Sequence, residues 1–268
     1  MNEVNRTLFI PLYGKSFVSK QHIIISDPDA ERIWDAEGFP IRGKSKSKWL
    51  AYNMAMRARV FDDWTDRMLR KHPEVLVLHI GCGLDSRCSR VKAPYRAWVD
   101  CDLPDVIAIR REYFDETPKY CMQALDASDP SQISLLPESD TAIIVLEGIS
   151  MYLSAEQLHA FFAALQEKYR VLCILMDIYT KFGAKASKYK NPVNDVGVTK
   201  LYGIDDMTDV IGGLGLRVVR EHTFTPAALV NELKMPDRAF FKLMFTGRLY
   251  GKIYRLMELA TDPRKVRT

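Results

Sequence analysis

Two short apolar runs, the first ending in glycines and the second in acids, constrain the fold of this chain more than any other feature. The run Val75–Ile80 is followed by a Gly-x-Gly motif at Gly81 and Gly83, and the next apolar run ends in Asp100 and Asp102. Glycines let the backbone turn tightly and approach a ligand closely. An acid at the tip of the neighbouring strand is placed to bind ribose hydroxyls. The pattern therefore predicts a nucleotide-type pocket at the edge of an α/β sheet.

The number of glycines indicates which nucleotide ligand suits this pocket. A dinucleotide fingerprint needs a third glycine for close helix packing, and that position is Ser86 in this chain. The lysine-containing Walker motif of nucleoside triphosphatases is not formed at these glycines. Two glycines with a ribose-binding acid suit S-adenosylmethionine (AdoMet), which has no pyrophosphate. On the local pattern alone, a glycine-rich turn in an unrelated α/β protein is an equally good interpretation.

Composition narrows the class of protein further. The 268 residues are 47% hydrophobic, the formal net charge is only +4, and no apolar stretch approaches the roughly twenty residues of a membrane span. The first ten residues lack a signal-peptide pattern. The five cysteines are scattered without a C-x-x-C pair, and the histidines do not cluster with them. We therefore expect a cytoplasmic protein with reduced thiols, no metal site, and no nucleic-acid or membrane partner.

The order of predicted elements divides the chain in two. Residues 1–70 are predicted to be helical, with a long helix over about residues 50–70, and to form a cap within the same domain as residues 71–268. From residue 71 onward strands and helices alternate, which predicts a doubly wound, parallel α/β sheet. Ser154 and Gln157 predict a capping box at the start of one helix. The expected strands are Val75–Ile80, Ala97–Asp100, Tyr120–Leu125, Ile143–Leu146, Val171–Asp177 and residues 215–221.

The C-terminal segment allows two structures. Its apolar residues, from Phe240 to Leu259, could form one helix packed on the core. Alternatively, Ile253–Leu259 could form a final antiparallel strand, and the sequence does not separate the two.

Two arginines of the helix over residues 50–70 are candidate anion ligands. Arg57 lies on the edge of the apolar stripe of this helix, whereas Arg59 lies on the other side. An arginine at an apolar edge either meets an anion or extends its charge to solvent. The stripe recurs at helical spacing and consists of Met54, Ala58, Phe61, Thr65 and Met68.

Six segments, in order along the chain, resemble the leucine carboxyl methyltransferase superfamily and, within it, the TcmP-like polyketide O-methyltransferases. The most specific elements are G-L-D-x-R and E-G-x-x-x-Y-L. The resemblance implies a Rossmann-like, seven-stranded methyltransferase sheet with an N-terminal helical cap. It also implies transfer of a methyl group from AdoMet to a small organic molecule. The six segments are residues Asn5–Lys15, Asp27–Ala30, Arg57–Asp63, Gly81–Arg87, Asp100–Pro104 and Glu147–Leu153.

The resemblance implies roles for the residues that follow the first two strands. Gly81 and Gly83 would contact the methionine part of AdoMet, and Asp102 would contact the ribose. Asp100 stands where many methyltransferases place their ribose-binding acid, although this family usually has glutamate there. We expect at least one of these two acids to cap the helix after Pro104 instead.

The resemblance also implies roles at the next two strand ends. Asp126 and Ala127 would contact the adenine, although Asp126 equally suits a helix cap and Ala127 replaces the leucine of the family. Glu147 would face the ligand. It follows the buried run Ile143–Leu146, where burying an unpaired carboxylate costs free energy, so a purely structural role is disfavoured. Tyr152 either positions the acceptor or fills the core.

The cap supplies the cations in this interpretation. Either Arg59 or Arg57 would bind the carboxylate of AdoMet, because a guanidinium matches a carboxylate through two parallel hydrogen bonds. The resemblance implies the position of Arg59, whereas the helical pattern favours Arg57. Lys15 would be a second partner of the carboxylate.

The acceptor stays open between a carboxyl and a hydroxyl group of a polyketide-like molecule. A carboxylate acceptor is already ionised and needs no general base, and the motifs offer no obvious base, whereas a phenol or enol would benefit from one. Three other interpretations compete with this one. They are a nicotinamide-dependent dehydrogenase, a non-catalytic binding or scaffold protein with the same fold, and a protein carboxyl methyltransferase.

Overall fold

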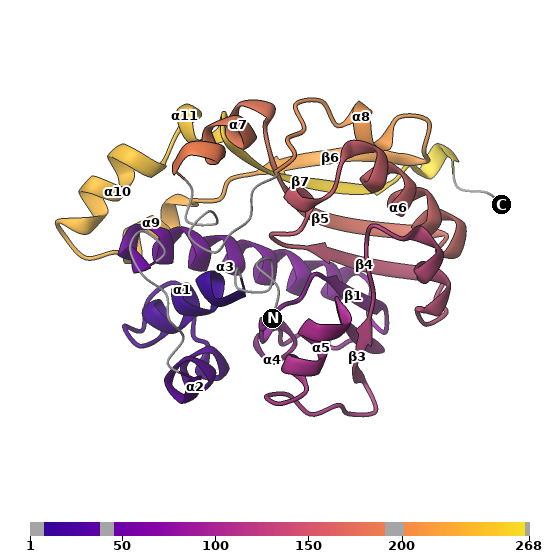
Figure 1. The fold of residues 1–268 in the computed structure, drawn as a ribbon, viewed down its shortest axis with the longest axis horizontal. Coiled ribbons are helices and arrows are strands. Elements are labelled where there is room, and N and C mark those ends of the chain that lie inside the picture. Colours follow the sequence, from indigo (N-terminus) through magenta and orange to yellow (C-terminus); the bar gives the residue numbers. More distant parts are fainter. Residues whose placement is uncertain (1–7, 38–45, 191–200, 266–268) are drawn as a thin grey trace.

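The computed structural model describes residues 8–37, 46–190 and 201–265, and its centre is a seven-stranded sheet in the order β3-β2-β1-β4-β5-β7-β6 (Figure 1). The first five strands run parallel, and β7 pairs antiparallel with both β5 and β6. The predicted doubly wound α/β sheet is therefore confirmed, including its seven strands. The strands are β1 (Leu76–Ile80), β2 (Ala97–Asp102), β3 (Tyr120–Ala124), β4 (Thr141–Leu146), β5 (Val171–Tyr179), β6 (Leu216–His222) and β7 (Tyr254–Thr261).

Helices cover both faces of the sheet because the central strands are buried on both sides. Along β1, Val77 belongs to a buried cluster shared with α3 and α5, while Leu76 and Leu78 belong to a cluster shared with α6 and α8. Continuous apolar strands of this kind are typical of parallel sheets. The helices are α1 (Phe9–Ser19), α2 (Pro28–Glu37), α3 (Lys48–Lys71), α4 (Arg87–Arg90), α5 (Pro104–Arg110), α6 (Ala155–Lys168), α7 (Lys181–Lys190), α8 (Thr208–Ile211), α9 (Ala227–Glu232), α10 (Asp237–Phe245) and α11 (Arg248–Gly251).

Short 3-10 turns complete the chain, and one predicted cap is confirmed. The Ser154 side chain accepts a hydrogen bond from the backbone of Gln157, and the Gln157 side chain accepts one from the backbone of Ser154, so α6 begins with the expected capping box. The turns are η3 (Pro130–Leu135), η4 (Ser150–Tyr152) and η6 (Pro263–Lys265).

The N-terminal helices and the sheet share one core. Phe61 and Trp64 of α3 belong to the same buried cluster as Val77 of β1 and Val145 of β4, and α3 runs across the sheet in Figure 1. Helices α1 and α2 contribute residues to the same cluster, and a further buried cluster joins α1 and α3 to α9 and α10. This shared core supports our proposal that residues 1–70 are a cap within the same domain as residues 71–268.

The C-terminal segment forms a strand and not one long helix. Helix α10 ends at Phe245, and the following Gly247 has φ 96°, a left-handed conformation that interrupts a helix. The chain then enters β7, where Leu256 and Leu259 are fully buried between the flanking strands. The second of the two predicted structures is therefore correct.

Three properties of the described residues bear on the class of protein. All five cysteines are free thiols. No group of three or more potential metal ligands is found among these residues. None of their helices has the length and apolar character that a membrane span requires.

Candidate cofactor and acceptor site

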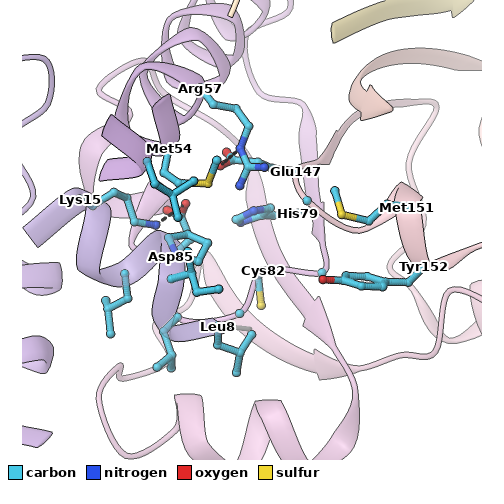
Figure 2. A pocket seen from close by; sticks show the side chains of 18 of the residues that line it. Leu8, Lys15, Met54, Arg57, His79, Cys82, Asp85, Glu147, Met151 and Tyr152 are labelled. Carbon is cyan, nitrogen blue, oxygen red and sulfur yellow. Dashed lines mark hydrogen bonds and ion pairs between the residues drawn. The ribbon is translucent and has the colours of Figure 1, made fainter. Parts of the chain in front are cut away.

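A cavity of about 140 Å³ lies at the carboxyl ends of β1, β4 and β5, beneath α1 and α3. Ligands of doubly wound sheets bind at this edge. In Figure 2, Lys15 and Leu8 enter from one side of the cavity, while Met151 and Tyr152 enter from the other. Its lining also includes the glycine loop after β1, the acid after β4, and two tyrosines, Tyr179 and Tyr254.

The two glycines of the loop have conformations that favour glycine. Gly81 has φ 71° and Gly83 has φ 52°, and left-handed backbone is strained for other residues. A Cβ atom on Gly81 would lie 2.8 Å from the side chain of Ile149, and one on Gly83 would lie 2.9 Å from Leu8. The loop therefore brings bare backbone to the cavity, as the sequence predicts.

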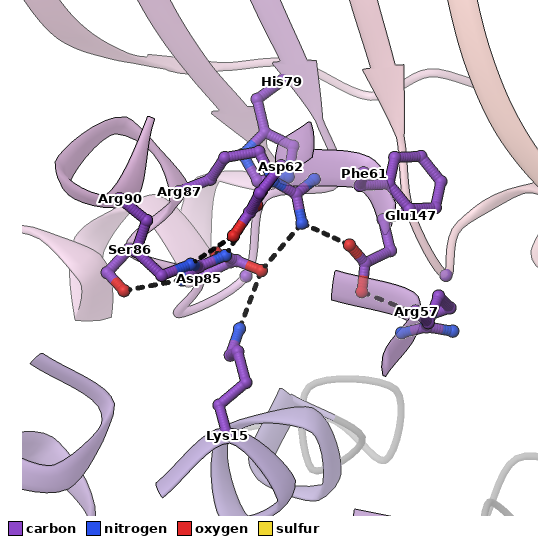
Figure 3. Close-up of polar contacts among 12 residues, drawn as sticks. Lys15, Arg57, Phe61, Asp62, His79, Asp85, Ser86, Arg87, Arg90 and Glu147 are labelled. Atoms are coloured by element: carbon purple, nitrogen blue, oxygen red, sulfur yellow. Dashed lines mark hydrogen bonds and ion pairs between the residues drawn. The ribbon is translucent and has the colours of Figure 1, made fainter. Parts of the chain in front are cut away.

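A chain of buried charges connects four residues of the cavity lining through Arg87 (Figure 3). The Nε of Arg57 donates to Glu147 at 2.9 Å, and Arg87 donates to the other oxygen of the same carboxylate. Arg87 also contacts Asp85 at 3.3 Å, and Lys15 pairs with Asp85 at 2.7 Å. The cavity is thus lined by both signs of charge, from four different elements of the chain.

The arginines keep the two acids of this chain ionised. Burial by itself would raise the pKa of Glu147, but Arg87 and Arg57 outweigh burial and lower it below its ordinary value. Burial also opposes ionisation of Asp85, and Arg90, Lys15 and Arg87 together hold its pKa well below the usual range. Both carboxylates therefore present negative charge to the cavity at neutral pH.

The structure separates the two arginine candidates. Arg57 lines the cavity, whereas Arg59 does not. The side chain of Arg59 is 41% exposed, and it pairs with Asp63 and donates to the carbonyl of Ile24. Arg57 and Arg59 therefore face different surroundings, because residues two apart on a helix point to nearly opposite sides.

Asp100 is buried in the core and does not line the cavity. Its side chain is 0% exposed, and it accepts hydrogen bonds from Trp98 at 2.8 Å and Tyr120 at 2.9 Å, and another from Arg110. The Nδ1 of His79 lies 3.1 Å from it. Burial opposes ionisation, but Arg110 and His79 lower the pKa of Asp100 to about 2. Core groups therefore surround the carboxylate of Asp100, and it does not line the cavity.

Asp102 lies at the carboxyl end of β2, two residues beyond Asp100. It is the last residue of β2, and its carboxylate accepts hydrogen bonds from the backbone of Gly83 and of Leu103, each at 2.8 Å. Burial raises its pKa, and these two hydrogen bonds work against that rise. Helix α5 has no side-chain cap, so the expectation that Asp100 or Asp102 caps it is wrong. Asp102 instead ties the glycine loop to the second strand.

The remaining predicted residues are Asp126 and Ala127, which follow β3, and Tyr152 in the turn η4. Asp126 follows β3 and accepts a hydrogen bond from the backbone of Ser128 at 2.8 Å, while Ala127 is buried in the core. Asp129, and not Asp126, caps η3. Neither Asp126 nor Ala127 lines the enclosed cavity, whereas Tyr152 does.

The site contains residues to which the sequence analysis gave no role. Asp85 and Arg87 belong to the G-L-D-x-R motif, so the resemblance already marked their positions. Asp177 is an acid near the end of the apolar fifth strand, just as Glu147 follows the apolar fourth strand. Tyr254 carried no signal, because its segment fitted a helix as well as a strand.

Comparison with known sequences agrees with this architecture. The leucine carboxyl methyltransferase family matches residues 2–166. The tetracenomycin polyketide synthesis O-methyltransferase TcmP of Streptomyces glaucescens is 28% identical over 206 residues, which cover 75% of each chain. The S-adenosyl-L-methionine-dependent methyltransferase dpfgK of Gibberella zeae is 28% identical over 136 residues, covering 47% of this chain and 46% of that protein.

Comparison with solved structures concerns the fold alone. The magnesium protoporphyrin IX methyltransferase of Synechocystis, solved with bound SAH, superposes with a TM-score of 0.51 at 13% identity, covering 86% of this chain and 93% of that one. A putative sarcosine dimethylglycine methyltransferase of Galdieria sulphuraria gives 0.52 at 11% identity, with coverages of 88% and 99%. Both support the Rossmann-like methyltransferase sheet.

Proposed function

The chain belongs to the leucine carboxyl methyltransferase family, and on that premise we propose that it transfers a methyl group from AdoMet to a carboxyl or hydroxyl oxygen of a small, polyketide-like molecule. One observation carries this proposal. The cavity joins a glycine loop with positive φ angles to two cations, Lys15 and Arg57, and two acids, Asp85 and Glu147. This combination matches a zwitterionic ligand that also carries a sulfonium.

The residues of the cavity fit the methionine end of AdoMet. When bound, AdoMet supplies an electrophilic methyl group on a positively charged sulfur. Arg57 and Lys15 would bind its carboxylate, since charge-assisted hydrogen bonds of this kind are strong. Glu147 and Asp85, both ionised, would balance its ammonium and sulfonium charges. The positive φ of Gly81 lets the chain turn at the end of β1, so that the loop backbone lines the cavity.

The nucleoside end would lie outside the enclosed space. Typical pockets for drug-sized ligands measure roughly 300–1,000 Å³, so the cavity of about 140 Å³ accounts for only part of AdoMet and its acceptor. Asp102 would bind the ribose beyond Gly83, and Asp126 with Ala127 would flank the adenine beyond that. These assignments follow the order of the strand ends, β1, β2 and β3.

The chain's contribution to the reaction is chiefly position and charge. Methyl transfer requires the acceptor oxygen in line with the carbon–sulfur bond, and fixing two reactants in that geometry lowers the barrier substantially. Tyr152 and Tyr179 line the same cavity and would orient the acceptor. The name of the Streptomyces relative, a polyketide synthesis O-methyltransferase, supports an acceptor of this kind.

Calorimetric titration with S-adenosylhomocysteine (AdoHcy), with NADH as a control, tests the proposal. Micromolar binding of AdoHcy without binding of NADH is the expected result, because no third glycine supports a dinucleotide. Binding of NADH alone would favour the dehydrogenase interpretation. Binding of neither would favour a scaffold protein and would overturn the proposal. Transfer of labelled methyl groups to a panel of phenols and carboxylic acids then separates an enzyme from a non-catalytic AdoMet-binding protein.

A further inference from the structure

Helix α10 is apolar on more than one side, and the protein covers only one of them. Phe241 is fully buried in a cluster with residues of α1, α3 and α9, and its ring centroid lies 5.0 Å from that of Phe245. Other apolar side chains of this segment face solvent. Leu243 is 79% exposed, more than any other large hydrophobic residue that the structure describes. A helix that is apolar on its open side lacks a partner there.

The exposed apolar residues are concentrated in one place. Eight large hydrophobic residues of the described chain are exposed, and four of them lie in this segment. Single exposed apolar residues are ordinary, whereas a contiguous patch marks an interaction site. In Figure 1, α10 lies at the outer edge of the molecule. We call these four residues the α10 patch, and they are Met235, Phe240, Leu243 and Met244.

Uncompensated positive charge accompanies the α10 patch. The side chains of Lys234 and Lys242 are exposed, and neither forms an ion pair within the part of the chain that the structure describes. The acid of the helix, Asp237, is already neutralised, because it pairs with Lys48 at 2.8 Å and accepts a hydrogen bond from Tyr52 at 3.1 Å. The next acid along the chain is Glu232, and it accepts a hydrogen bond from the backbone of Ile24. The surface beside the patch is therefore positive.

An indole ring borders the patch. The ring centroid of Trp49, near the start of α3, lies 4.5 Å from that of Phe240, and the Nζ of Lys48 lies 4.7 Å from the indole centroid. Tryptophan and lysine combine an apolar body with a polar end, and both suit the boundary between hydrocarbon and water. Exposed Phe, Leu and Met with Trp and Lys beside them are typical of a helix that lies in a membrane surface.

The number of residues and their charges disfavour a second copy of the chain as the partner. A stable protein interface uses roughly 20–30 residues from each side, whereas the patch has four. In a symmetric dimer the same surface faces itself. Lys234 and Lys242 would then approach their own counterparts, and facing like charges are destabilising. A bilayer that contains anionic lipids offers negative headgroups to the lysines and acyl chains to the apolar side chains.

We propose that α10 docks the protein on anionic lipid surfaces, with Phe240, Leu243 and Met244 inserted among the lipid headgroups and Lys234 and Lys242 bound to anionic headgroups. Docking of this kind needs no membrane-spanning helix. The sequence-based expectation of no membrane partner depended on the net charge of the whole chain, which is only +4, whereas the charge beside the patch is local. The proposal does not depend on the proposed methyl transfer.

Flotation of the full-length protein with lipid vesicles tests the proposal. One set of vesicles contains phosphatidylcholine alone, and the other contains equal parts of phosphatidylcholine and anionic phosphatidylglycerol. We expect binding to the anionic vesicles at low salt and much weaker binding to the neutral ones. High salt should weaken binding to the anionic vesicles, because salt screens exposed charges.

Variants separate the apolar and the charged contributions. L243S should weaken binding to the anionic vesicles about tenfold, since it removes one inserted leucine. Its matched control is L135S, which removes a leucine that is 60% exposed on η3, and its binding should be unchanged.

The double variant K234Q/K242Q should weaken binding about 25-fold, or about fivefold for each charge. Its matched control is K92Q/K119Q, which removes two exposed lysines from other elements and should bind like the wild-type protein. Thermal unfolding of all four variants checks that each is folded.

Four outcomes would overturn the proposal. They are no binding to anionic vesicles, equal binding to neutral vesicles, equal losses in L243S and L135S, and equal losses in K234Q/K242Q and K92Q/K119Q. Sedimentation equilibrium examines the second copy directly. A wild-type dimer that L243S converts into a monomer would assign the patch to self-association instead.

Discussion

Two buried charge clusters stand side by side at the strand ends, and only one of them faces the cavity. In the first, Asp100 pairs with Arg110, and both side chains are 0% exposed. In the second, Glu147 pairs with Arg57 and Arg87 and lines the cavity. One acid lies within β2 and the other directly follows β4, and both are held by arginine. Burial and charge therefore do not by themselves identify a ligand-binding acid.

The two clusters differ in the groups that surround their carboxylates. The carboxylate of Asp100 is surrounded by core groups from three strands and a helix, so no position is left for a ligand. Glu147 and Arg57 are not fully surrounded by protein groups, because both line the cavity. We expect the first cluster to govern stability and the second to govern binding.

The largest expected effect is on stability, in the variant D100A. Removing Asp100 leaves the guanidinium of Arg110 buried without its partner, which destabilises a protein by about 3–5 kcal/mol. Urea denaturation would measure this loss. The assignment of stability to the Asp100 cluster would be contradicted if D100A kept wild-type stability and lost affinity for AdoHcy.

The Asp100–Arg110 cluster should also make the stability of the protein depend on pH in the acidic range. The pKa of Asp100 is lowered to about 2 in the folded protein, against about 3.9 in an unfolded chain. A lowered pKa contributes stability that is present above pH ~4 and is lost as the pH falls toward ~2, on the order of 2 kcal/mol. Unfolding free energies measured between these pH values should decline less steeply in D100N than in the wild-type protein. Equal slopes would contradict a structural ion at this position.

Binding should depend instead on Glu147. In E147Q, an uncharged amide faces Arg57 and Arg87, and the negative charge beside the ligand's positive groups is lost. We expect AdoHcy binding to weaken about 10- to 100-fold, which is about 1.4–2.8 kcal/mol. Titration calorimetry would measure this, with D100N compared under conditions where both variants are folded. Equal losses of affinity in the two variants would show that the clusters are not functionally distinct.

The smallest effect should separate the two arginines of α3. R57K keeps a positive charge but cannot span Glu147, Asp177 and Tyr254 at once, since lysine lacks the planar fork of arginine. We expect AdoHcy binding to weaken about tenfold, or about 1.4 kcal/mol. R59K is the matched control on the same helix, and its affinity should be unchanged. A larger loss in R59K than in R57K would restore the alternative assignment of the carboxylate ligand.

Predictions from the sequence were reliable where one local pattern admitted one structure. The apolar runs located the central strands β1, β4 and β5, because a buried parallel strand must be continuously apolar. The segment around Ile253–Leu259 was ambiguous, because a short apolar run satisfies a helix and a strand equally well. Pairing with β5 and β6 decided it, and those strands lie far away in the sequence.

The sequence indicated which positions lie near the site better than it indicated what each side chain contacts there. Helical periodicity favoured Arg57 over Arg59, and the structure agrees, because the direction of a helical side chain follows from its spacing. Asp100 and Asp102 share one side of β2, so periodicity could not separate them. Their difference comes from depth along the strand, since Asp100 lies opposite Met122 within the sheet while Asp102 ends the strand.

The sequence by itself determined the parallel part of the sheet, the glycine loop at its edge and the family to which the chain belongs. These follow from local patterns, because backbone conformation and side-chain burial repeat at short, fixed intervals. Only the tertiary structure decided which charges share the cavity. Arg57 meets Glu147 across 90 residues and Tyr254 across 197. A buried charge takes whichever partner the fold brings to it, and no interval in the sequence encodes that partner.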